Sequence, residues 1–452
     1  MKVFWLRREL ILCISISIVL TCSLLIIRRM NSTSSSVDTS NTQPDKTTII
    51  QELVATGVIV KPQVEIITKV ELIPEVKTDK PDTVINNTLS SIYAQINSQS
   101  SQLDCGFPRL VLVIQVHDRL HYLEQLLQSL KENEQIQHTL VITSHDLYVP
   151  EVHKLVTSVF YTRVIPIYYP YSQQIYKETF PGNDPKDCTK SIQREEALRI
   201  KCNNADTPDQ YGNYREAKFT AIKHHWFWKI VTVFDKLKCL SDYSGQVIFL
   251  EEDHYTSPDF ITTALRLEEL RDEQCPECDF INMGVYKPKS VEKMHARNVE
   301  MYEWIAGDHN MGFGMDRRIW EKIKDCAGYL CSFDDYNWDW SLQAVGMFCL
   351  KKKFIVLSLT IPRIFHLGTC GVHQKSGECK PEQQAGLVKK SFLGPEYMND
   401  DKLELVGPTD RLKTGRMPNP RGFGGWGDKR DHNLCIRYLR DGFPISKIDI
   451  LK

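Results

Sequence analysis

The sequence predicts an α/β fold built on a Rossmann-like, nucleotide-binding parallel sheet, and three apolar segments carry this prediction. The runs 110–116, 140–143 and 163–168 are short and rich in β-branched residues, which is typical of buried strands. The segment 120–130 has the pattern of an amphipathic helix, and a second helix is expected between the last two runs. Because strands that alternate with helices form parallel sheets, a ligand should bind beyond the carboxyl ends of the strands.

Polar residues follow the first two of these runs, where the strands should end. His117, Asp118 and Arg119 come directly after the first run, and Asp146 comes shortly after the second. Carboxyl ends of neighbouring parallel strands lie at one edge of a sheet, so these side chains should meet there.

A fourth apolar run delivers three acids in succession. The segment 214–234 is expected to form a long helix, and it leads into the strand 246–250, which stops at Glu251, Glu252 and Asp253. Crowded carboxylates repel one another unless a cation joins them, so a hard divalent metal that neutralises a pyrophosphate fits this pattern. The alternative is a solvated acidic turn, the commoner origin of an isolated acidic triplet. The buried strand before the triplet favours the metal site.

The composition describes a globular protein with a sizeable core. The chain has 452 residues, of which 42% are hydrophobic and 25% charged. Lys and Arg together number 56 and Asp and Glu 57, so no broad basic field is available for nucleic acid or for an acidic membrane surface. An anionic ligand must therefore be bound by local groups.

The N-terminal region predicts a membrane anchor and a stem. The run 10–27 contains no charged residue and is long enough to cross a bilayer as a helix. A cleaved signal peptide is the alternative, but arginines follow the run directly and no small-residue cleavage site is evident. We expect a cytosolic tail at 1–9, an anchor helix at 10–27, a luminal stem at 28–104 and a catalytic domain at 105–452.

Cysteines and glycosylation sequons indicate that the body of the chain is luminal. Of the 14 cysteines, only Cys13 and Cys22 fall in the apolar run, and the density of the others suits an oxidising compartment. Asn31 and Asn86 begin N-glycosylation sequons before the expected catalytic domain.

The segment 331–340 combines acids with aromatic rings, as a sugar site requires. Ring faces cover the C–H surfaces of sugars, while carboxylates accept hydrogen bonds from hydroxyls. Asp334 or Asp335 could instead cap a helix whose aromatic residues belong to the core. Asp339 is the candidate base, because Trp338 and Trp340 would desolvate it and raise its pKa.

Three further patterns have competing interpretations. His366, Cys370, His373 and Cys379 have a spacing that suits zinc, although a Cys370–Cys379 disulfide is favoured in an oxidising lumen. Similarly, Cys275 and Cys278 favour a tight disulfide over zinc or a redox centre. The glycine-rich segment 422–427 lacks the signature of a phosphate loop, so a turn-rich surface loop is expected.

Taken together, a set of motifs in collinear order between residues 110 and 438 closely resembles the N-acetylglucosaminyltransferase II family, the α-1,6-mannosyl-glycoprotein 2-β-N-acetylglucosaminyltransferases. The combination is far more specific than any single motif. The motifs are Gln115-Val-His-Asp-Arg119, Ser144-His-Asp146, Tyr214-Arg-Glu-Ala-Lys218, Lys223-His-His-Trp226, Phe249-Leu-Glu-Glu-Asp-His-Tyr255, Cys275-Pro-Glu-Cys278, His309-Asn-Met-Gly312, Asp334-Asp-Tyr-Asn-Trp-Asp-Trp340, Ile361-Pro-Arg-Ile-Phe-His366 and Gly424-Gly-Trp-Gly-Asp428.

The resemblance implies a GT-A glycosyltransferase fold, an inverting mechanism, and Mn²⁺ with UDP-GlcNAc as donor. It places Asp253 and His366 at the metal, Asp339 as the base, and Trp338 and Asn310 at the acceptor. The residues implied to contact UDP-GlcNAc are Gln115, Val116, His117, Asp118, Arg119, Asp146, Ala221, Ile222, Lys223, His224, His225 and Ser290. Two of these depart from the family pattern: Asp118 replaces a more usual Asn, and Ser290, with Lys289 beside it, replaces a basic residue.

Five disulfides are also implied by the resemblance, with Cys105 and Cys239 left unpaired. The expected pairs are Cys188–Cys202, Cys275–Cys278, Cys326–Cys349, Cys331–Cys435 and Cys370–Cys379.

The function implied is transfer of GlcNAc in β1,2 linkage to the α1,6-arm mannose of N-glycans in the Golgi. The same transfer to another mannose, on the α1,3 arm or O-linked to protein, is an alternative, as is a non-catalytic, metal-dependent glycan-binding protein. The expected partners are UDP-GlcNAc, an N-glycan acceptor and the Golgi membrane, with a homodimer left open and no nucleic acid.

Overall fold

The structure is a computed structural model that describes residues 81–286, 296–368, 380–392, 402–406 and 420–440. Several predictions fall outside these residues: the anchor at 10–27, most of the stem with Asn31, the residue Ser290, and the Cys370–Cys379 disulfide. Within the part of the chain that the structure describes, no helix combines the length and the apolar character needed to span a membrane.

A nine-stranded sheet forms the centre of the fold, with the strand order β11-β7-β9-β6-β8-β4-β1-β2-β3. Strands β3, β2, β1 and β4 are parallel neighbours, while β8 runs antiparallel between β4 and β6. The predicted α/β fold is therefore confirmed, and its sheet is mixed, with mostly parallel pairs and antiparallel ones at β8 and between β7 and β9. The strands are β1 (Leu110–Val116), β2 (Thr139–His145), β3 (Arg163–Tyr168), β4 (Val247–Glu251), β6 (Phe280–Asn282), β7 (Asn298–Glu303), β8 (Phe313–Met315), β9 (Ile355–Leu359) and β11 (Glu404–Leu405).

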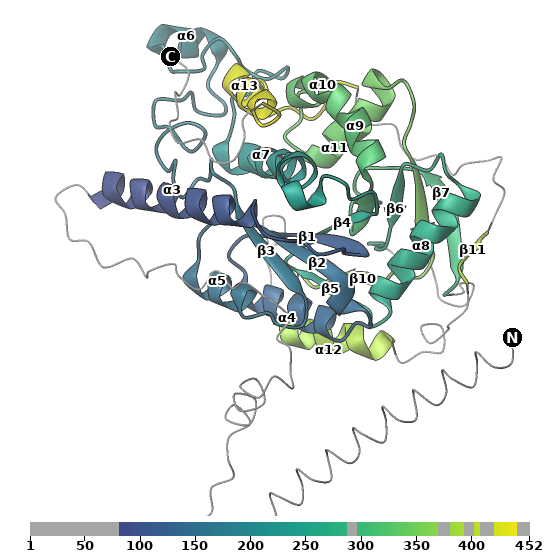
Figure 1. Cartoon of the computed structure of the whole chain (residues 1–452). Coiled ribbons are helices and arrows are strands. Elements are labelled where there is room, and N and C mark those ends of the chain that lie inside the picture. Colours follow the sequence, from purple (N-terminus) through teal and green to yellow (C-terminus); the bar gives the residue numbers. More distant parts are fainter. Residues whose placement is uncertain (1–80, 287–295, 369–379, 393–401, 407–419, 441–452) are drawn as a thin grey trace, which may run out of the picture. The chain divides into compact units, whose positions relative to one another are not determined.

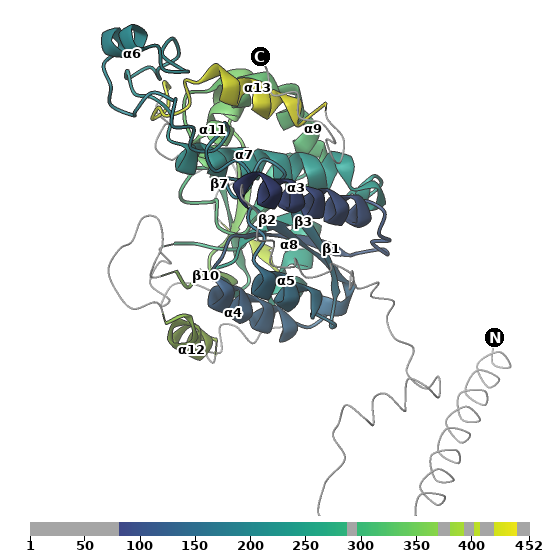
Figure 2. The ribbon, with the colours of Figure 1, turned by 90° about the vertical axis from the view of Figure 1, so that its left-hand side faces the viewer.

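Helices cover both faces of this sheet (Figure 1). Alternate residues of β1 show why: Val111 and Val113 pack in one apolar cluster with α7 (Ala217–Val231), whereas Leu112 and Ile114 pack in another with α4 (Leu120–Lys131). This alternation follows from the two-residue repeat of a strand. Helices α5 (Pro150–Thr157) and α8 (Phe260–Gln274) also contribute to the α4 side. On the other side, α7 lies between the sheet and α13 (Lys429–Arg437) (Figure 2).

The remaining elements complete the layers and form one small second sheet. Strand β5 (His254–Thr256) pairs antiparallel with β10 (Ile364–His366). The other helices are α3 (Pro81–Ser100), α6 (Arg194–Ile200), α9 (Arg317–Asp325), α10 (Ala327–Ser332), α11 (Trp338–Ala344) and α12 (Pro381–Ser391), with short helical turns at Ile136–His138, Thr232–Lys236, Lys238–Leu240 and Val345–Cys349. The long helix predicted over 214–234 thus consists of α7 followed by a π-helical turn.

Helix α3 belongs to the compact fold, although the sequence assigns its residues to the stem. Tyr93 and Ile96 are almost fully buried in the core. The Asn97 amide donates to the Tyr168 carbonyl and its oxygen accepts the Tyr168 amide hydrogen, each at 2.7 Å. An edge strand leaves backbone groups unpaired, and α3 satisfies and covers them at β3. The compact fold therefore begins before residue 105, and the Asn86 sequon falls on this helix.

Five disulfides are present among the described residues, and four were expected from the family resemblance. These four are Cys188–Cys202, Cys275–Cys278, Cys326–Cys349 and Cys331–Cys435. The prediction that Cys105 and Cys239 are unpaired is wrong, because they form the fifth, with Cα atoms 5.4 Å apart. Cys105 precedes β1 and Cys239 precedes β4, and these strands are neighbours in the sheet, so their entry segments meet.

We expect non-reducing peptide mapping to recover a linked pair of peptides that contain Cys105 and Cys239. The bridge spans a sequence separation of 134 residues. By the chain-entropy argument, closing so long a loop stabilises the fold by up to about 5 kcal/mol. The double variant Cys105→Ser/Cys239→Ser should therefore unfold at a clearly lower temperature, whereas free thiols at both positions in the mature protein would contradict the pairing.

Candidate active site

The carboxyl ends of β1, β2 and β4 converge on one polar edge of the sheet. Gln115 of β1 is in register with Ser144 of β2 on one side and Glu251 of β4 on the other. Strands β2 and β3 extend the sheet to one side of β1, and β4 lies on the opposite side. The position between β1 and β4 is thus the switch point at which open α/β sheets bind ligands.

Residues predicted to contact the nucleotide meet at this edge. The His117 imidazole pairs with Asp146 at 2.8 Å, and its backbone amide donates to the Glu252 carboxylate at the same distance. The Asp146 carboxylate raises the pKa of His117 to about 9, so the ring carries a positive charge at neutral pH. The ring is half exposed and available to an anionic ligand. Asp118, beside it, is exposed.

Arg119 binds the acidic triplet. Its Nε donates to Glu252 at 2.6 Å and its Nη1 to Asp253 at 2.7 Å. Both carboxylates are buried, with exposed fractions of 1% for Glu252 and 3% for Asp253. Buried carboxylates need such partners. The triplet is therefore part of an organised charged site, and the interpretation as a solvated acidic turn is wrong for Glu252 and Asp253.

The small β5–β10 sheet brings His366 to Asp253. His366 is in register with His254, the residue after Asp253. The backbone amide of Leu367 donates to the Asp253 carbonyl at 2.8 Å, and the His366 Nε2 atom lies 3.2 Å from Asp253 Oδ2. This hydrogen bond raises the pKa of His366. The two residues predicted as metal ligands are thus adjacent.

The side chains around Asp253 fit a divalent cation. Among the described residues, Asp253 Oδ1 is buried without a hydrogen-bond partner, which leaves an anionic oxygen to be satisfied. One side-chain atom each of Glu251, Asp253 and His254 lies within 4.8 Å of the others, so two carboxylates and an imidazole are crowded at this point. Carboxylate oxygens are the ligands that hard divalent cations prefer.

His254 is less suited than His366 to be the nitrogen ligand. Burial lowers the pKa of His254 to about 4, so the ring is neutral, and its Nδ1 accepts the Glu251 backbone hydrogen at 3.1 Å. A neutral ring that accepts at Nδ1 carries its hydrogen on Nε2 and has no free lone pair for a metal. We therefore retain Asp253 and His366 as the candidate ligand pair.

Gly368 leaves the space that this pair needs. A Cβ atom at position 368 would lie 2.5 Å from Asp253 Oδ2 and 2.6 Å from His366 Cε1. We expect Gly368→Ala to weaken Mn²⁺-dependent UDP binding, measured by calorimetry, because the methyl group displaces both side chains. Gly386→Ala on α12 is the matched control, since nothing lies within 4 Å of its added carbon. Equal UDP affinity in both variants would contradict this role.

Asp339, the predicted base, lies in the first turn of α11. Its Oδ2 accepts from Asn310 at 2.9 Å and its Oδ1 accepts the Trp340 backbone hydrogen at 2.9 Å. Burial raises the pKa of Asp339 to about 6. Trp338 stacks on Trp226 with ring centroids 4.2 Å apart, which holds the start of the helix. The desolvated carboxylate expected from the sequence is confirmed.

Asp334 and Asp335 do not cap α11, because its N-cap residue is Asn337. Asp335 accepts from the backbone amides of Asn337 and Phe423, at 2.9 and 3.0 Å. Asp334 accepts from the amides of Gln210 and Trp426, at 2.7 and 3.0 Å. These carboxylates instead connect three segments that are distant in the sequence: the one around Gln210, the one that contains Asp334 and Asn337, and the one that contains Phe423 and Trp426.

The glycine-rich segment 422–427 is consequently not a surface loop. Trp426 is fully buried, and Gly422 has a φ of 77° with the Asp334 carbonyl where its side chain would be. Only glycine tolerates both conditions. The ring of Phe423 remains exposed and packs edge-on against Trp340, with ring centroids 5.3 Å apart.

The sequence model of the family described as N-acetylglucosaminyltransferase II matches residues 85–435 of this chain. The chain belongs to the N-acetylglucosaminyltransferase II family. Curated relatives named α-1,6-mannosyl-glycoprotein 2-β-N-acetylglucosaminyltransferase include the protein of Sus scrofa, which is 41% identical over 332 residues and covers 73% of each chain. Those of Homo sapiens and Arabidopsis thaliana are 39% identical over 376 residues and 31% identical over 342 residues. They cover 82% and 74% of this chain, and 83% and 76% of their own.

A solved structure with detectable similarity is a mannosyltransferase of Pyrobaculum calidifontis in complex with GDP-Man and Mn²⁺. It is 10% identical, covers 69% of this chain and 79% of its own, and has a TM-score of 0.29. We infer nothing about this member of the N-acetylglucosaminyltransferase II family from so low a score.

Part of the donor-contacting set predicted from the N-acetylglucosaminyltransferase II resemblance lies inside the protein. Lys223, His224 and His225 are at most 2% exposed. His224 binds Asp431 and Tyr438, both at 2.9 Å, and His225 binds Ser144 at 2.8 Å. Each side chain is thus engaged with protein groups, because this face of α7 packs into the fold.

The other predicted donor contacts lie closer to solvent, with one exception. Ala221 and Ile222 are half-buried. Gln115 is half-buried too, and its side-chain oxygen accepts from Lys229 at 2.7 Å. Val116 is the exception, because its side chain is buried in the core.

Sequence reasoning missed two residues that shape the site of this N-acetylglucosaminyltransferase II family member. Lys229 is a buried lysine that donates to Gln115 at the polar edge of the sheet, and Gly368 borders the Asp253–His366 pair. The position of Lys229 about one turn beyond the Lys223–His225 cluster on one helix could have suggested the first. Nothing local marks Gly368, because its role depends on the contact of β10 with β5.

Proposed function

We propose that this chain is an inverting β1,2-N-acetylglucosaminyltransferase that transfers GlcNAc from UDP-GlcNAc to the α1,6-arm mannose of N-glycans. The relatives carry this activity in their name. The observation in this chain that carries the proposal is the buried Asp339 carboxylate, held by Asn310, in a protein that also keeps the Asp253–His366 pair. A binding protein would have no need for a base with a pKa of about 6.

Asp339 is proposed to accept the proton of the mannose 2-hydroxyl as that oxygen attacks the anomeric carbon. Its raised pKa makes it a stronger base than an ordinary carboxylate, while it remains mostly ionised at neutral pH. The Asn310 hydrogen bond fixes the orientation of one Asp339 oxygen. Asn310 Oδ1 is buried without a hydrogen-bond partner among the described residues. A single displacement on an α-linked donor leaves a β-linked product.

Asp253 and His366 are proposed to hold Mn²⁺, which supplies charge neutralisation for the departing diphosphate. Asp253 provides the unsatisfied oxygen Oδ1, and His366 provides an imidazole nitrogen within reach. Arg119 and the protonated His117 add positive charge at the same edge of the sheet. These side chains orient UDP with its diphosphate toward β4.

We further propose a GT-A fold and a type II membrane protein of the Golgi. The first rests on the parallel sheet and on the acids at the end of β4. The second rests on the apolar run at 10–27 and on the luminal character of the cysteines and sequons.

An acceptor panel tests the function. The purified full-length protein is incubated with UDP-GlcNAc and Mn²⁺ and with N-glycans that carry GlcNAc on the α1,3 arm, on the α1,6 arm or on neither, together with an O-mannosyl peptide. We expect transfer only to the glycan that carries GlcNAc on the α1,3 arm and has a free α1,6-arm mannose, with a β1,2 linkage seen by NMR. Transfer to another mannose would redefine the acceptor, and glycan binding without transfer would contradict an enzymatic role.

A further inference from the structure

Lys223 is a buried lysine that contacts the segment leading to the candidate base. Its side chain is fully buried on α7 and its Nζ donates to two backbone carbonyls, that of Phe333 at 3.1 Å and that of Asp335 at 2.8 Å. The ammonium also lies 4.3 Å from the centre of the Trp426 ring.

The two carbonyls frame the turn that precedes α11. The Asp335 carbonyl also accepts from the Ser341 hydroxyl, at 3.2 Å. The Asp335 carboxylate accepts from the Asn337 backbone amide, and Asn337 is the N-cap of α11. Asp339 follows two residues later. A shift of this turn would therefore move the first turn of the helix and, with it, the base.

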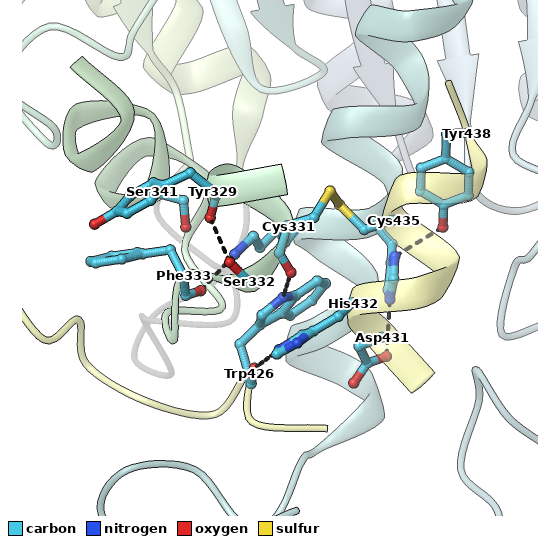
Figure 3. The surroundings of a disulfide bond; sticks show 12 residues. Tyr329, Cys331, Ser332, Phe333, Ser341, Trp426, Asp431, His432, Cys435 and Tyr438 are labelled. Carbon is cyan, nitrogen blue, oxygen red and sulfur yellow. Dashed lines mark hydrogen bonds and ion pairs between the residues drawn. A yellow bond between two sulfur atoms is a disulfide. The ribbon is translucent and has the colours of Figure 1, made fainter. Parts of the chain in front are cut away.

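The opposite side of the same segment is anchored by the C-terminal part of the chain (Figure 3). The Trp426 indole donates to the Cys331 carbonyl at 2.8 Å, and Cys331 is disulfide-bonded to Cys435 of α13. The His432 ring lies 2.6 Å from the Trp426 carbonyl. Lys223 sits between this anchored tryptophan and the turn, so one ammonium joins α7, the turn and the glycine-rich segment.

An ammonium suits this position because it can donate to several oxygens at once and also interacts with the face of an indole ring. Burial lowers the pKa of Lys223, and the nearby Asp335 and Asp334 carboxylates oppose that shift. Desolvating a charge is unfavourable unless its hydrogen bonds are made, so the surrounding carbonyls must stay in place. This requirement makes the turn rigid.

We propose that Lys223 is a positioning residue for Asp339 and does not contact the donor nucleotide, as the family resemblance had implied. It holds the 333–337 turn at the distance from α7 that places the base. The inference rests on the proposed transferase function.

The test compares Lys223→Met with Lys218→Met in the purified full-length enzyme. Lys218 is on the same helix and its side chain is 67% exposed. We expect Lys223→Met to lower kcat about 10- to 100-fold, as a misplaced catalytic group does, while the Kd for UDP with Mn²⁺ stays at the parental value. Amide hydrogen exchange over 335–341 should be faster than in the parent. Lys218→Met should leave all three quantities unchanged.

Weaker UDP binding in Lys223→Met with parental kcat would overturn the proposal and restore a nucleotide contact, and unchanged kcat with unchanged exchange would also overturn it. If Lys223→Met does not fold, Lys223→Arg replaces it. The guanidinium is bulkier than the ammonium and would displace the surrounding groups at this fully buried position, so turnover should again fall at parental UDP affinity. Parental turnover, or weaker UDP binding, in that variant would overturn the proposal.

If the parent itself transfers no GlcNAc, the proposed function fails. Amide exchange over 335–341 then decides the inference separately: faster exchange in the Lys223 variant supports the positioning role, and unchanged exchange removes it.

Discussion

Asp339→Asn should lower kcat by about two to four orders of magnitude while UDP-GlcNAc binding stays nearly intact, because a positioned general base contributes that much to a rate. The amide has the size of the carboxylate and can still accept at its oxygen, but it cannot take a proton from the mannose hydroxyl. Steady-state kinetics together with calorimetric UDP binding measure the two effects.

The pH profile of the parent provides an independent readout of the same residue. Burial raises the pKa of Asp339 to about 6, and only the ionised form is a base. Activity should therefore be present above pH 6 and decline as the pH falls through that value. The residual activity of Asp339→Asn should lack this acidic limb, and an unchanged limb would assign the ionisation to another group.

Asp334→Asn and Asp335→Asn distinguish the base from its surroundings. Each removes charge from a carboxylate that binds two backbone amides of distant segments. Both variants should unfold at a lower temperature than the parent, while their kcat should fall much less than that of Asp339→Asn. If either abolished turnover in a well-folded protein while Asp339→Asn remained active, the base would have to be reassigned.

The second large effect is expected at the metal site. Asp253→Asn should weaken Mn²⁺-dependent UDP binding at least about 100-fold, since even residues that only support a metal ligand alter affinity by roughly 10- to 100-fold. The amide lacks the negative charge of the Asp253 carboxylate. That charge interacts with Arg119 and His366 and would also bind the metal. Titration of UDP with and without Mn²⁺ measures the change.

His366→Ala should have the same direction of effect, because it removes the second ligand. Asp242→Asn, an exposed residue in the turn before β4, is the matched control for the charge change. Parental Mn²⁺-dependent UDP affinity in both Asp253→Asn and His366→Ala would remove the metal assignment. Full transferase activity in excess chelator would also contradict the metal assignment.

Local sequence patterns were sufficient to predict the central strands and the acidic residues that follow them. The β-branched runs that became β1, β2 and β3 carry their own preference for a buried sheet, and parallel pairing then places His117, Asp146 and Glu252 at one edge. Asp339 was singled out as a candidate because it lies between two tryptophans in the sequence, and the structure shows that its carboxylate is buried. In both cases the cause and the consequence lie within a few residues of each other.

The family resemblance, and not local pattern, predicted contacts between residues that are far apart in the sequence. It indicated His366 as a partner of Asp253 and four of the disulfides that the structure contains. It also implied donor contacts for Lys223, His224 and His225, which the packing of α7 directs into the protein.

The sequence by itself therefore determined the layered α/β architecture and the acidic end of β4, since each depends on local periodicity and composition, and it singled out Asp339 as the candidate base. Only the tertiary structure decided that Cys105 pairs with Cys239, that α3 covers the edge of β3, and that Lys223 supports the turn before α11. These features depend on which neighbours the sheet order and the burial of a helix face bring together, and no short segment of the sequence contains that information.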